Sequence, residues 1–305
     1  MSIERASIKA VPKPWGSTDL RPWSNLAQNR SPIGELWFER AAASASEPAL
    51  LLKLLFTTQP LSIQVHPDDE YARSVGLPHG KTEAWYIVAA APDARIALGL
   101  EHIVPVSKLR AAIEDGSIAE LVHWQHVQRD EAVLVPAGTI HAIGAGLVIA
   151  EIQQRSDATF RLFDYGSHRE LHVEDAARAA FTGPALPQIA PTQLSMARRL
   201  LAVSPYFVFE RVDLPASSSW EFDLEGEGWV LALSGEATFA SSPLSAGEAI
   251  FVDSQSVSVH AGDRGLNGLI AYVGTRPSAT LLRCVDSAAD HAVDDHPPET
   301  QEALQ

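Results

Sequence analysis

The chain has 305 residues, 46% of them hydrophobic, and a formal net charge of −15 at pH 7. This length supports a full hydrophobic core and predicts two domains, or one large β domain with an appendage. The negative charge argues against nucleic acid and anionic membranes as partners, although local Lys and Arg side chains can still bind a small anion.

The compartment is indicated by two features of the sequence. No apolar run approaches the roughly 18 residues of a membrane span, and the start of the chain, MSIERASIKA, lacks the apolar stretch of a secretory signal. The single cysteine, Cys284, cannot form an internal disulfide, which fits a reducing compartment. We therefore expect a cytoplasmic protein in which Cys284 is a core thiol on a strand.

The first 65 residues have the pattern of strands and turns. Short apolar or alternating runs are separated by Pro, Gly, Ser and Asn, namely SIKAV, GELWFER, ALLLKLLF and LSIQV. Between the first two runs, the proline-rich segment Pro12–Leu20 is expected to form a loop in which Trp15 anchors the packing. EAWYIV, RIALGL, EAVLV, IHAI, LVIAEIQQ and TFRLFDY extend the strand pattern as far as residue 165.

Helical signals interrupt this pattern at three places. The segment PDDEYAR after His66 places acidic residues in a first helical turn. Residues 106–125 predict two short inserted helices, with Ser117 and Glu120 as a capping box after an Asp-Gly break. Residues 170–181 predict a further helix that ends before a Gly-Pro pair, and a proline-rich linker follows.

The second half of the chain is predicted to be all β and to echo the first half. EGWVLALSG resembles EAWYIVAAA, so that Glu227 corresponds to Glu83. We therefore expect a mainly β fold of two cupin-like jelly-roll barrels with short helical insertions. Residues 1–195 would form the catalytic metal-binding domain with its helical insert near 106–125, and 196–285 a degenerate second barrel without a metal site. The acidic segment 286–305 is expected to be disordered.

Four polar residues are candidates for a metal site. Gln64 and His66 are two apart on a predicted strand and so face the same way. Glu83 begins another strand, and His141 follows a Pro-Ala-Gly-Thr turn. If these segments lie side by side, one carboxylate, two imidazoles and one amide oxygen meet in a barrel lumen, and this set can bind a divalent metal such as zinc. Because amides are poor ligands, Gln64 either binds the metal or supports a ligand.

Several motifs occur together and in order: IQVHPDDEYA, GKTEAWYIV, VPAGTIHAI and QQRSDATFRLFDY. They closely resemble the type I mannose-6-phosphate isomerases (phosphomannose isomerases) of the cupin superfamily, in their short bacterial form. The resemblance implies reversible conversion of mannose 6-phosphate to fructose 6-phosphate, with one Zn²⁺ per chain. It implies metal ligands and basic active-site residues at the following positions: Gln64, His66, Glu83 and His141 as ligands, with Lys81 and Arg161 as the basic residues.

An isomerase of this kind must move a proton between C2 and C1 and stabilise negative charge on oxygen. The sequence does not identify the base. Lys81, two residues before Glu83, is interpreted as a proton-transfer group or a phosphate partner. Arg161 has an active-site role or forms an ion pair with Asp157 or Asp164. His79 is a lesser candidate, as are Arg155 and Arg169 for phosphate.

Two other functions compete with the isomerase. Two His and one carboxylate on a barrel also suit a non-haem iron oxygenase, and a sugar-phosphate sensor would keep the ligands without turnover. In each case we expect a small-molecule ligand, no nucleic-acid or membrane partner, and a monomer or homodimer.

Overall fold

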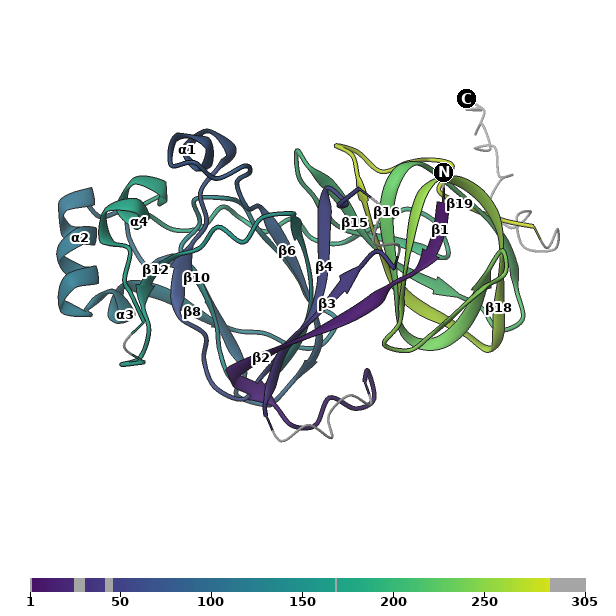
Figure 1. The fold of residues 1–305 in the computed structure, drawn as a ribbon, viewed down its shortest axis with the longest axis horizontal. Coiled ribbons are helices and arrows are strands. Elements are labelled where there is room, and N and C mark those ends of the chain that lie inside the picture. Colours follow the sequence, from purple (N-terminus) through teal and green to yellow (C-terminus); the bar gives the residue numbers. More distant parts are fainter. Residues whose placement is uncertain (1, 25–30, 42–45, 168, 286–305) are drawn as a thin grey trace, which may run out of the picture.

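The computed structural model describes residues 2–24, 31–41, 46–167 and 169–285, and these residues form strands with a few short helices (Figure 1). The predicted mainly β fold is confirmed. The predicted tail, residues 286–305, lies outside the described residues. No helix in the described ranges is long and apolar enough to cross a membrane.

Three antiparallel sheets organise the chain, two of them built from its first 165 residues. The six-stranded sheet has the order β2 (Ser7–Ser17), β3 (Ile33–Glu39), β4 (Leu50–Thr57), β11 (Leu147–Gln154), β6 (Glu83–Ala90) and β9 (Ala132–Val135). The five-stranded sheet has the order β12 (Phe160–Phe163), β5 (Ile63–Val65), β10 (His141–Ile143), β7 (Arg95–Leu100) and β8 (Val122–His126).

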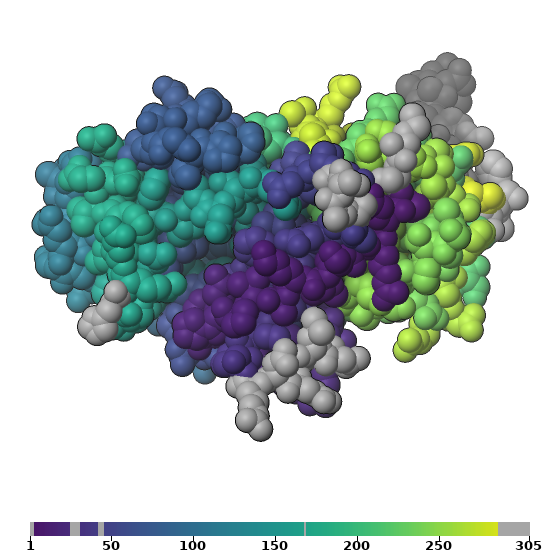
Figure 2. All heavy atoms as spheres, viewed as in Figure 1, coloured from purple at the N-terminus to yellow at the C-terminus, as the bar shows by residue number. Residues whose placement is uncertain are grey.

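The third sheet has eight strands and comes mostly from the second half of the chain. Its path is β13 (Thr192–Gln193), β14 (Arg198–Val203), β15 (Phe207–Leu214), β18 (Ala249–Val273), β16 (Ser219–Phe239) and β17 (Ser242–Ser245), with β19 (Leu282–Cys284) on β16 and β1 (Ser2–Arg5) on β18. The chain therefore starts in this sheet and crosses to the six-stranded sheet along β2, the purple run in Figure 2. The domain boundary near residue 195 stays a prediction.

Four helices are present in the described residues, close to the predicted places. They are α1 (Asp69–Ser74), α2 (Val106–Asp115), α3 (Ile118–Leu121) and α4 (Val173–Ala179). The Asp68 side chain caps α1 by accepting a hydrogen bond from Tyr71 N at 2.7 Å. Apolar side chains of α2 and α4 pack with those of the five-stranded sheet and cover its outer face (Figure 1).

Three local predictions are wrong. The Pro12–Leu20 segment is not all loop, because β2 continues to Ser17, although Trp15 is buried as expected. Ser117 makes no side-chain cap of α3; its N–H instead bonds Asp115 Oδ1 at 2.9 Å, which turns the chain. Val122 begins β8 rather than extending a helix, since pairing with β7 overrides the weak helical pattern.

β4 shows how the layers are held together. All eight of its residues are buried, as its continuous apolar sequence LLLKLLFT predicts for a strand covered on both faces. Leu52, Leu54 and Phe56 face the eight-stranded sheet, where they meet residues such as Phe209. Leu55 faces the space between the six- and five-stranded sheets. This second space contains the polar cluster described below.

The predicted equivalence of Glu227 with Glu83 is wrong. Trp85, on the same face of β6 as Glu83, packs between the six- and five-stranded sheets. Trp229, on the same face of β16 as Glu227, packs in the interface with the six-stranded sheet, and its Nε1 donates to the Leu50 carbonyl at 3.1 Å. A one-residue difference in register reverses the faces of a strand, so similar sequences point in opposite directions here.

Truncation of the interface between the sheets should destabilise the whole chain. We expect Phe209→Ala, at a fully buried position, to lower the free energy of unfolding by about 3–5 kcal/mol, measured by urea denaturation. Leu186→Ala, at a 68% exposed position, is the control and should change it by less than about 0.5 kcal/mol. Equal losses of unfolding free energy in the two variants would contradict a hydrophobic core shared between the sheets.

Candidate metal centre

Strand pairing brings the predicted residues into two facing rows. In the five-stranded sheet His141 lies opposite Gln64, which lies opposite Arg161, and residues directly opposite each other share a face. In the six-stranded sheet Glu83 lies opposite Gln153. Side chains from two sheets therefore converge, although their positions span some 100 residues of sequence.

Turn chemistry connects the segments. Gly138, in the predicted Pro-Ala-Gly-Thr turn, has a φ of 85°, a left-handed conformation that glycine adopts without strain. Its N–H donates to the His66 carbonyl at 2.8 Å, which joins the end of β5 to the turn before His141. The N–H of Lys81 donates to the Pro67 carbonyl at 3.0 Å and brings the start of β6 to the same place.

His66, Glu83 and His141 form the centre of the cluster. One ligand atom from each lies within 4.8 Å of the others, and all three residues are at most 1% exposed. His66 Nε2 is 3.5 Å from Glu83 Oε2, and His141 Nε2 is 3.5 Å from Glu83 Oε1. In the described part of the chain no other group of three acidic, His or Cys residues has this geometry.

Hydrogen bonds at the Nδ1 atoms of His66 and His141 fix both rings so that their Nε2 atoms face Glu83. His66 Nδ1 lies 2.7 Å from the Ala158 carbonyl, and His141 Nδ1 lies 2.8 Å from the Thr139 carbonyl. Because a carbonyl only accepts, both Nδ1 atoms carry the proton and both Nε2 lone pairs face the Glu83 carboxylate. The His66 Nε2 lone pair is met by Lys81 Nζ at 3.0 Å, and that of His141 by the Gln64 amide nitrogen at 3.2 Å. Together with the Glu83 carboxylate, these two neutral imidazole nitrogens are the ligand types that bind a divalent metal.

Burial keeps the histidines in the state that binds metal. Desolvation, aided by the nearby positive charge of Lys81, lowers the pKa of His66 to about 3. Desolvation also lowers the pKa of His141. Both rings are therefore neutral at physiological pH, as metal coordination requires.

Lys81 lies directly beside the three residues. Its Nζ is 2.6 Å from Glu83 Oε2 and 3.0 Å from His66 Nε2, and the residue is 5% exposed. Burial disfavours its charged form, but the nearby carboxylates, Glu83 first and then Glu151, together outweigh burial and raise the pKa of Lys81. A divalent ion bound to Glu83 would act in the opposite direction and favour the neutral amine.

Gln64 is close to the triad and half-buried. Its amide nitrogen lies 3.2 Å from His141 Nε2, and Ser62 Oγ lies 3.2 Å from its amide oxygen. Rotation of the amide by half a turn would direct the oxygen towards a metal held by His141. Its assignment as a ligand stays a prediction.

Arg161 lies at the end of the row and does not form the ion pairs considered from the sequence. Its Nη1 donates to the Glu170 carbonyl at 2.8 Å, and Asp164 is bound by Arg169 through two hydrogen bonds. Partial burial, with the neighbouring charge of Arg169, lowers the pKa of Arg161. Arg155 pairs with Glu47 at 3.1 Å, away from the row.

Sequence reasoning missed a buried ion pair beside the cluster. Lys53 Nζ and Glu151 Oε1 are 3.2 Å apart, and the two residues are 4% and 3% exposed. Glu151 lies opposite Trp85 on the face that carries Glu83. Burial, followed by the charge of Glu83, raises the pKa of Glu151. The available signal was a charge in the middle of each apolar run, LLLKLLF and LVIAEIQQ, at positions that are rarely buried without a function or a partner.

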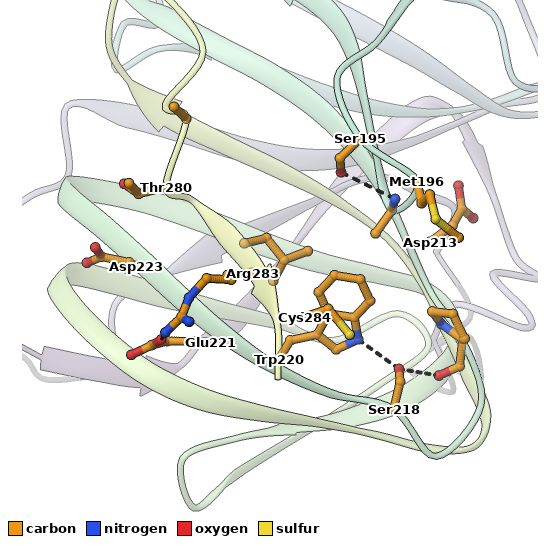
Figure 3. A pocket seen from close by; sticks show the side chains of 14 residues that line it. Ser195, Met196, Asp213, Ser218, Trp220, Glu221, Asp223, Thr280, Arg283 and Cys284 are labelled. Carbon is orange, nitrogen blue, oxygen red and sulfur yellow. Dashed lines mark hydrogen bonds and ion pairs between the residues drawn. The ribbon is translucent and has the colours of Figure 1, made fainter. Parts of the chain in front are cut away.

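A cavity away from the cluster is a second place to consider. It measures about 730 Å³ and opens beside β19, where Trp220 is flanked by Asp213, Glu221 and Asp223 (Figure 3). Its one basic side chain, Arg283, is paired with Glu221. Three carboxylates and a neutralised cation make this cavity unsuitable for an anionic substrate, so the buried cluster is the better candidate site.

The chain is similar to known isomerases. No protein-family model matches it. It is 35% identical over 202 residues to mannose-6-phosphate isomerase ManA of Bacillus subtilis (60% of this chain, 64% of that protein). It is 34% identical over 200 residues to mannose-6-phosphate isomerase of Streptococcus mutans (61% and 62%). The matches thus span less than two thirds of each relative.

Structural similarity to known proteins covers more of the chain than sequence similarity does. The crystal structure of mannose 6-phosphate isomerase from Bacillus subtilis superposes with a TM-score of 0.76 at 24% identity, over 89% of this chain and all of that one. A phosphomannose isomerase variant from Salmonella typhimurium superposes with a TM-score of 0.71 at 17% identity, over 89% and 100%. The chain therefore shares the mainly β fold of these structures, and its division into two barrels stays a prediction.

The metal-free protein should lose stability as the pH falls below about 6.5. The unfolded His66 takes up a proton near its ordinary pKa, whereas the folded residue resists protonation down to about pH 3. We expect His66 to account for about 2 kcal/mol of lost unfolding free energy between about pH 7.5 and about pH 5. Urea denaturation of the wild type and His66→Gln should show the shallower pH dependence in the variant, and parallel curves would contradict this prediction.

Removal of the central carboxylate should abolish tight metal binding. We expect Glu83→Gln to weaken binding of a divalent ion by more than about 100-fold, because changes in residues that merely support ligands already cost about 10–100-fold. Calorimetry with zinc on chelator-treated protein measures this. His79→Ala, at an exposed loop position, is the control and should bind like the wild type.

Proposed function

We propose that the chain is a metal-dependent aldose–ketose isomerase that interconverts mannose 6-phosphate and fructose 6-phosphate. The observation that carries the proposal is the buried His66, Glu83 and His141 triad, with Lys81 in direct contact and the Glu151–Lys53 pair on the same inner surface. The similarity to relatives named mannose-6-phosphate isomerase supports the substrate.

Zn²⁺, one per chain, is the ion that we propose. Two imidazoles and one carboxylate match the ligand types of catalytic zinc sites and leave positions for substrate oxygens or for Gln64. The bound ion would polarise the sugar oxygens as a Lewis acid. The protein holds its ligands through the two backbone carbonyls that fix the imidazole rings.

We assign proton transfer between C2 and C1 to Glu151. A proton-transfer group works best when its pKa lies near the operating pH, and burial beside the Glu83 charge moves the Glu151 carboxyl in that direction. The positive charge of Lys53, in contact at 3.2 Å, opposes this rise in the pKa of Glu151 and favours the ionised carboxylate. Lys81 is placed to donate a hydrogen bond to the oxygen on which negative charge develops.

Arg161 is the proposed partner of the phosphate group. Among the described residues it has no carboxylate ion pair. It lies opposite Gln64, on the same face of the five-stranded sheet as Gln64 and His141. In a chain with a net charge of −15, a guanidinium without a carboxylate partner next to the cluster is the group that attracts a phosphate dianion. We place the enzyme in the cytoplasm, as a monomer or homodimer without nucleic-acid or membrane partners.

Isomerase activity is tested by a coupled assay for fructose 6-phosphate formed from mannose 6-phosphate. We expect activity that is lost on chelation and restored by zinc. Stoichiometric metal without turnover would contradict the proposal and favour the sensor. Bound iron with oxygen-dependent turnover would favour the oxygenase.

Glu151→Gln should separate proton transfer from metal binding. We expect kcat to fall by about 10²–10⁴-fold, the usual contribution of a general acid–base group, with the zinc content unchanged. The measurements are steady-state kinetics and metal analysis of the same preparation. A variant that keeps more than about half of the wild-type kcat would exclude Glu151 as the base.

A further inference from the structure

The segment that carries Lys81 into the site lies directly on another stretch of backbone. A Cβ atom added to Gly80 would lie 2.5 Å from the Asp68 carbonyl carbon, so only glycine permits this contact. On either side of Gly80, Ser156 Oγ donates to the His79 carbonyl at 2.9 Å and Lys81 N donates to the Pro67 carbonyl. The position of Lys81 therefore depends on what holds residues 79–81.

Asp69 is the side chain that connects this segment to its surroundings. Its Oδ1 accepts hydrogen bonds from Gly80 N at 2.8 Å and from Gln154 Nε2 at 3.1 Å. Gln154 in turn accepts from Thr82 N at 2.9 Å, on the other side of Lys81. One carboxylate and one amide thus hold both flanks of Lys81 from outside the site.

The third partner of Asp69 comes from the eight-stranded sheet. Tyr206 Oη donates to Asp69 Oδ2 at 3.2 Å. Tyr206 is itself fixed in the turn before β15, where its N–H bonds Ser204 Oγ at 3.1 Å and its ring packs on the core between the sheets. A cavity of about 500 Å³ on this side is lined by Asp69, Gln154 and Tyr206 among others, and by none of the three residues of the metal centre.

We propose that Asp69 and Tyr206 are positioning residues for the isomerase reaction, through which the eight-stranded sheet holds Gly80 and thereby aims Lys81 at the metal centre. This inference rests on the proposed function. It gives the eight-stranded sheet a role in a site to which that sheet contributes no ligand.

Tyr206→Phe and Asp69→Ala test the proposal, since the first removes only the hydroxyl and the second removes all three contacts. We expect kcat to fall about 3- to 10-fold in Tyr206→Phe and about 10- to 100-fold in Asp69→Ala, because small displacements of a catalytic group are costly. KM and zinc stoichiometry should change less than about twofold. Asp69→Asn, which keeps an oxygen for Gly80 N, should recover part of the loss.

Tyr272→Phe is the matched control. Tyr272 Oη also donates to a carboxylate, that of Glu210 at 2.7 Å, and its side chain packs in a different core cluster of the eight-stranded sheet from the one that Tyr206 contacts. Removal of the Tyr272 hydroxyl should lower the free energy of unfolding and leave kcat unchanged. An equal loss of kcat in both Tyr variants would overturn the proposal.

A double-mutant cycle with Lys81→Met distinguishes positioning from general stability. If Tyr206 acts through Lys81, Tyr206→Phe should have no further effect on kcat once Lys81 is replaced. The same fold-loss in the Lys81→Met background would overturn the proposal.

Hydrogen exchange of residues 78–82, measured by mass spectrometry, gives a readout that needs no turnover. Exchange should be faster in Tyr206→Phe and Asp69→Ala than in the wild type and in Tyr272→Phe. If the wild type is inactive but shows this exchange pattern, the proposed isomerase function is overturned, whereas the role of Tyr206 and Asp69 in holding residues 78–82 is supported. An active wild type with unchanged exchange and kcat in the variants would overturn the positioning proposal alone.

Discussion

The Glu83 carboxylate, 1% exposed and placed between two imidazoles and an ammonium group, is the constraint on which the site depends. A buried anion is costly unless positive charge or hydrogen bonds surround it. Trp85 Nε1 donates to it at 3.0 Å, Lys81 pairs with it, and the Nε2 lone pairs of His66 and His141 face it. The cluster thus combines one carboxylate with two neutral imidazole nitrogens, a set that fits a divalent cation, and the Glu83 charge also helps to raise the pKa of Lys81.

The sheets provide the rigidity that this arrangement needs. The eight-residue strand β4 is buried on both faces, between the eight-stranded sheet and the layer that contains the cluster. Because β11 pairs with both β4 and β6, the Lys53–Glu151 pair and Glu83 have a fixed separation. Gln64, Glu83, His141 and Glu151 thus sit on strands. His66 directly follows β5, and Lys81 lies on an irregular segment whose contacts reach the eight-stranded sheet.

Much of the site could be predicted from the sequence because strand periodicity and turn residues are local signals. Gln64, His66, Glu83 and His141 do converge, since the Pro-Ala-Gly-Thr turn and the alternation in β5 fix their faces. The prediction for Glu227 failed for a related reason: two strand segments can have similar sequences and yet different registers. A shift of one residue in the register turns a side chain from one face of the sheet to the other.

The sequence by itself determined which residues carry chemistry and which segments form strands, because both follow from residue type and short-range periodicity. Only the tertiary structure decided that Lys53 and Glu151 meet, that Arg169 rather than Arg161 pairs with Asp164, and that Tyr206 reaches Asp69. Those contacts join residues whose separation along the chain bears no relation to their separation in space. The register and packing of whole sheets, rather than any local pattern, place them together.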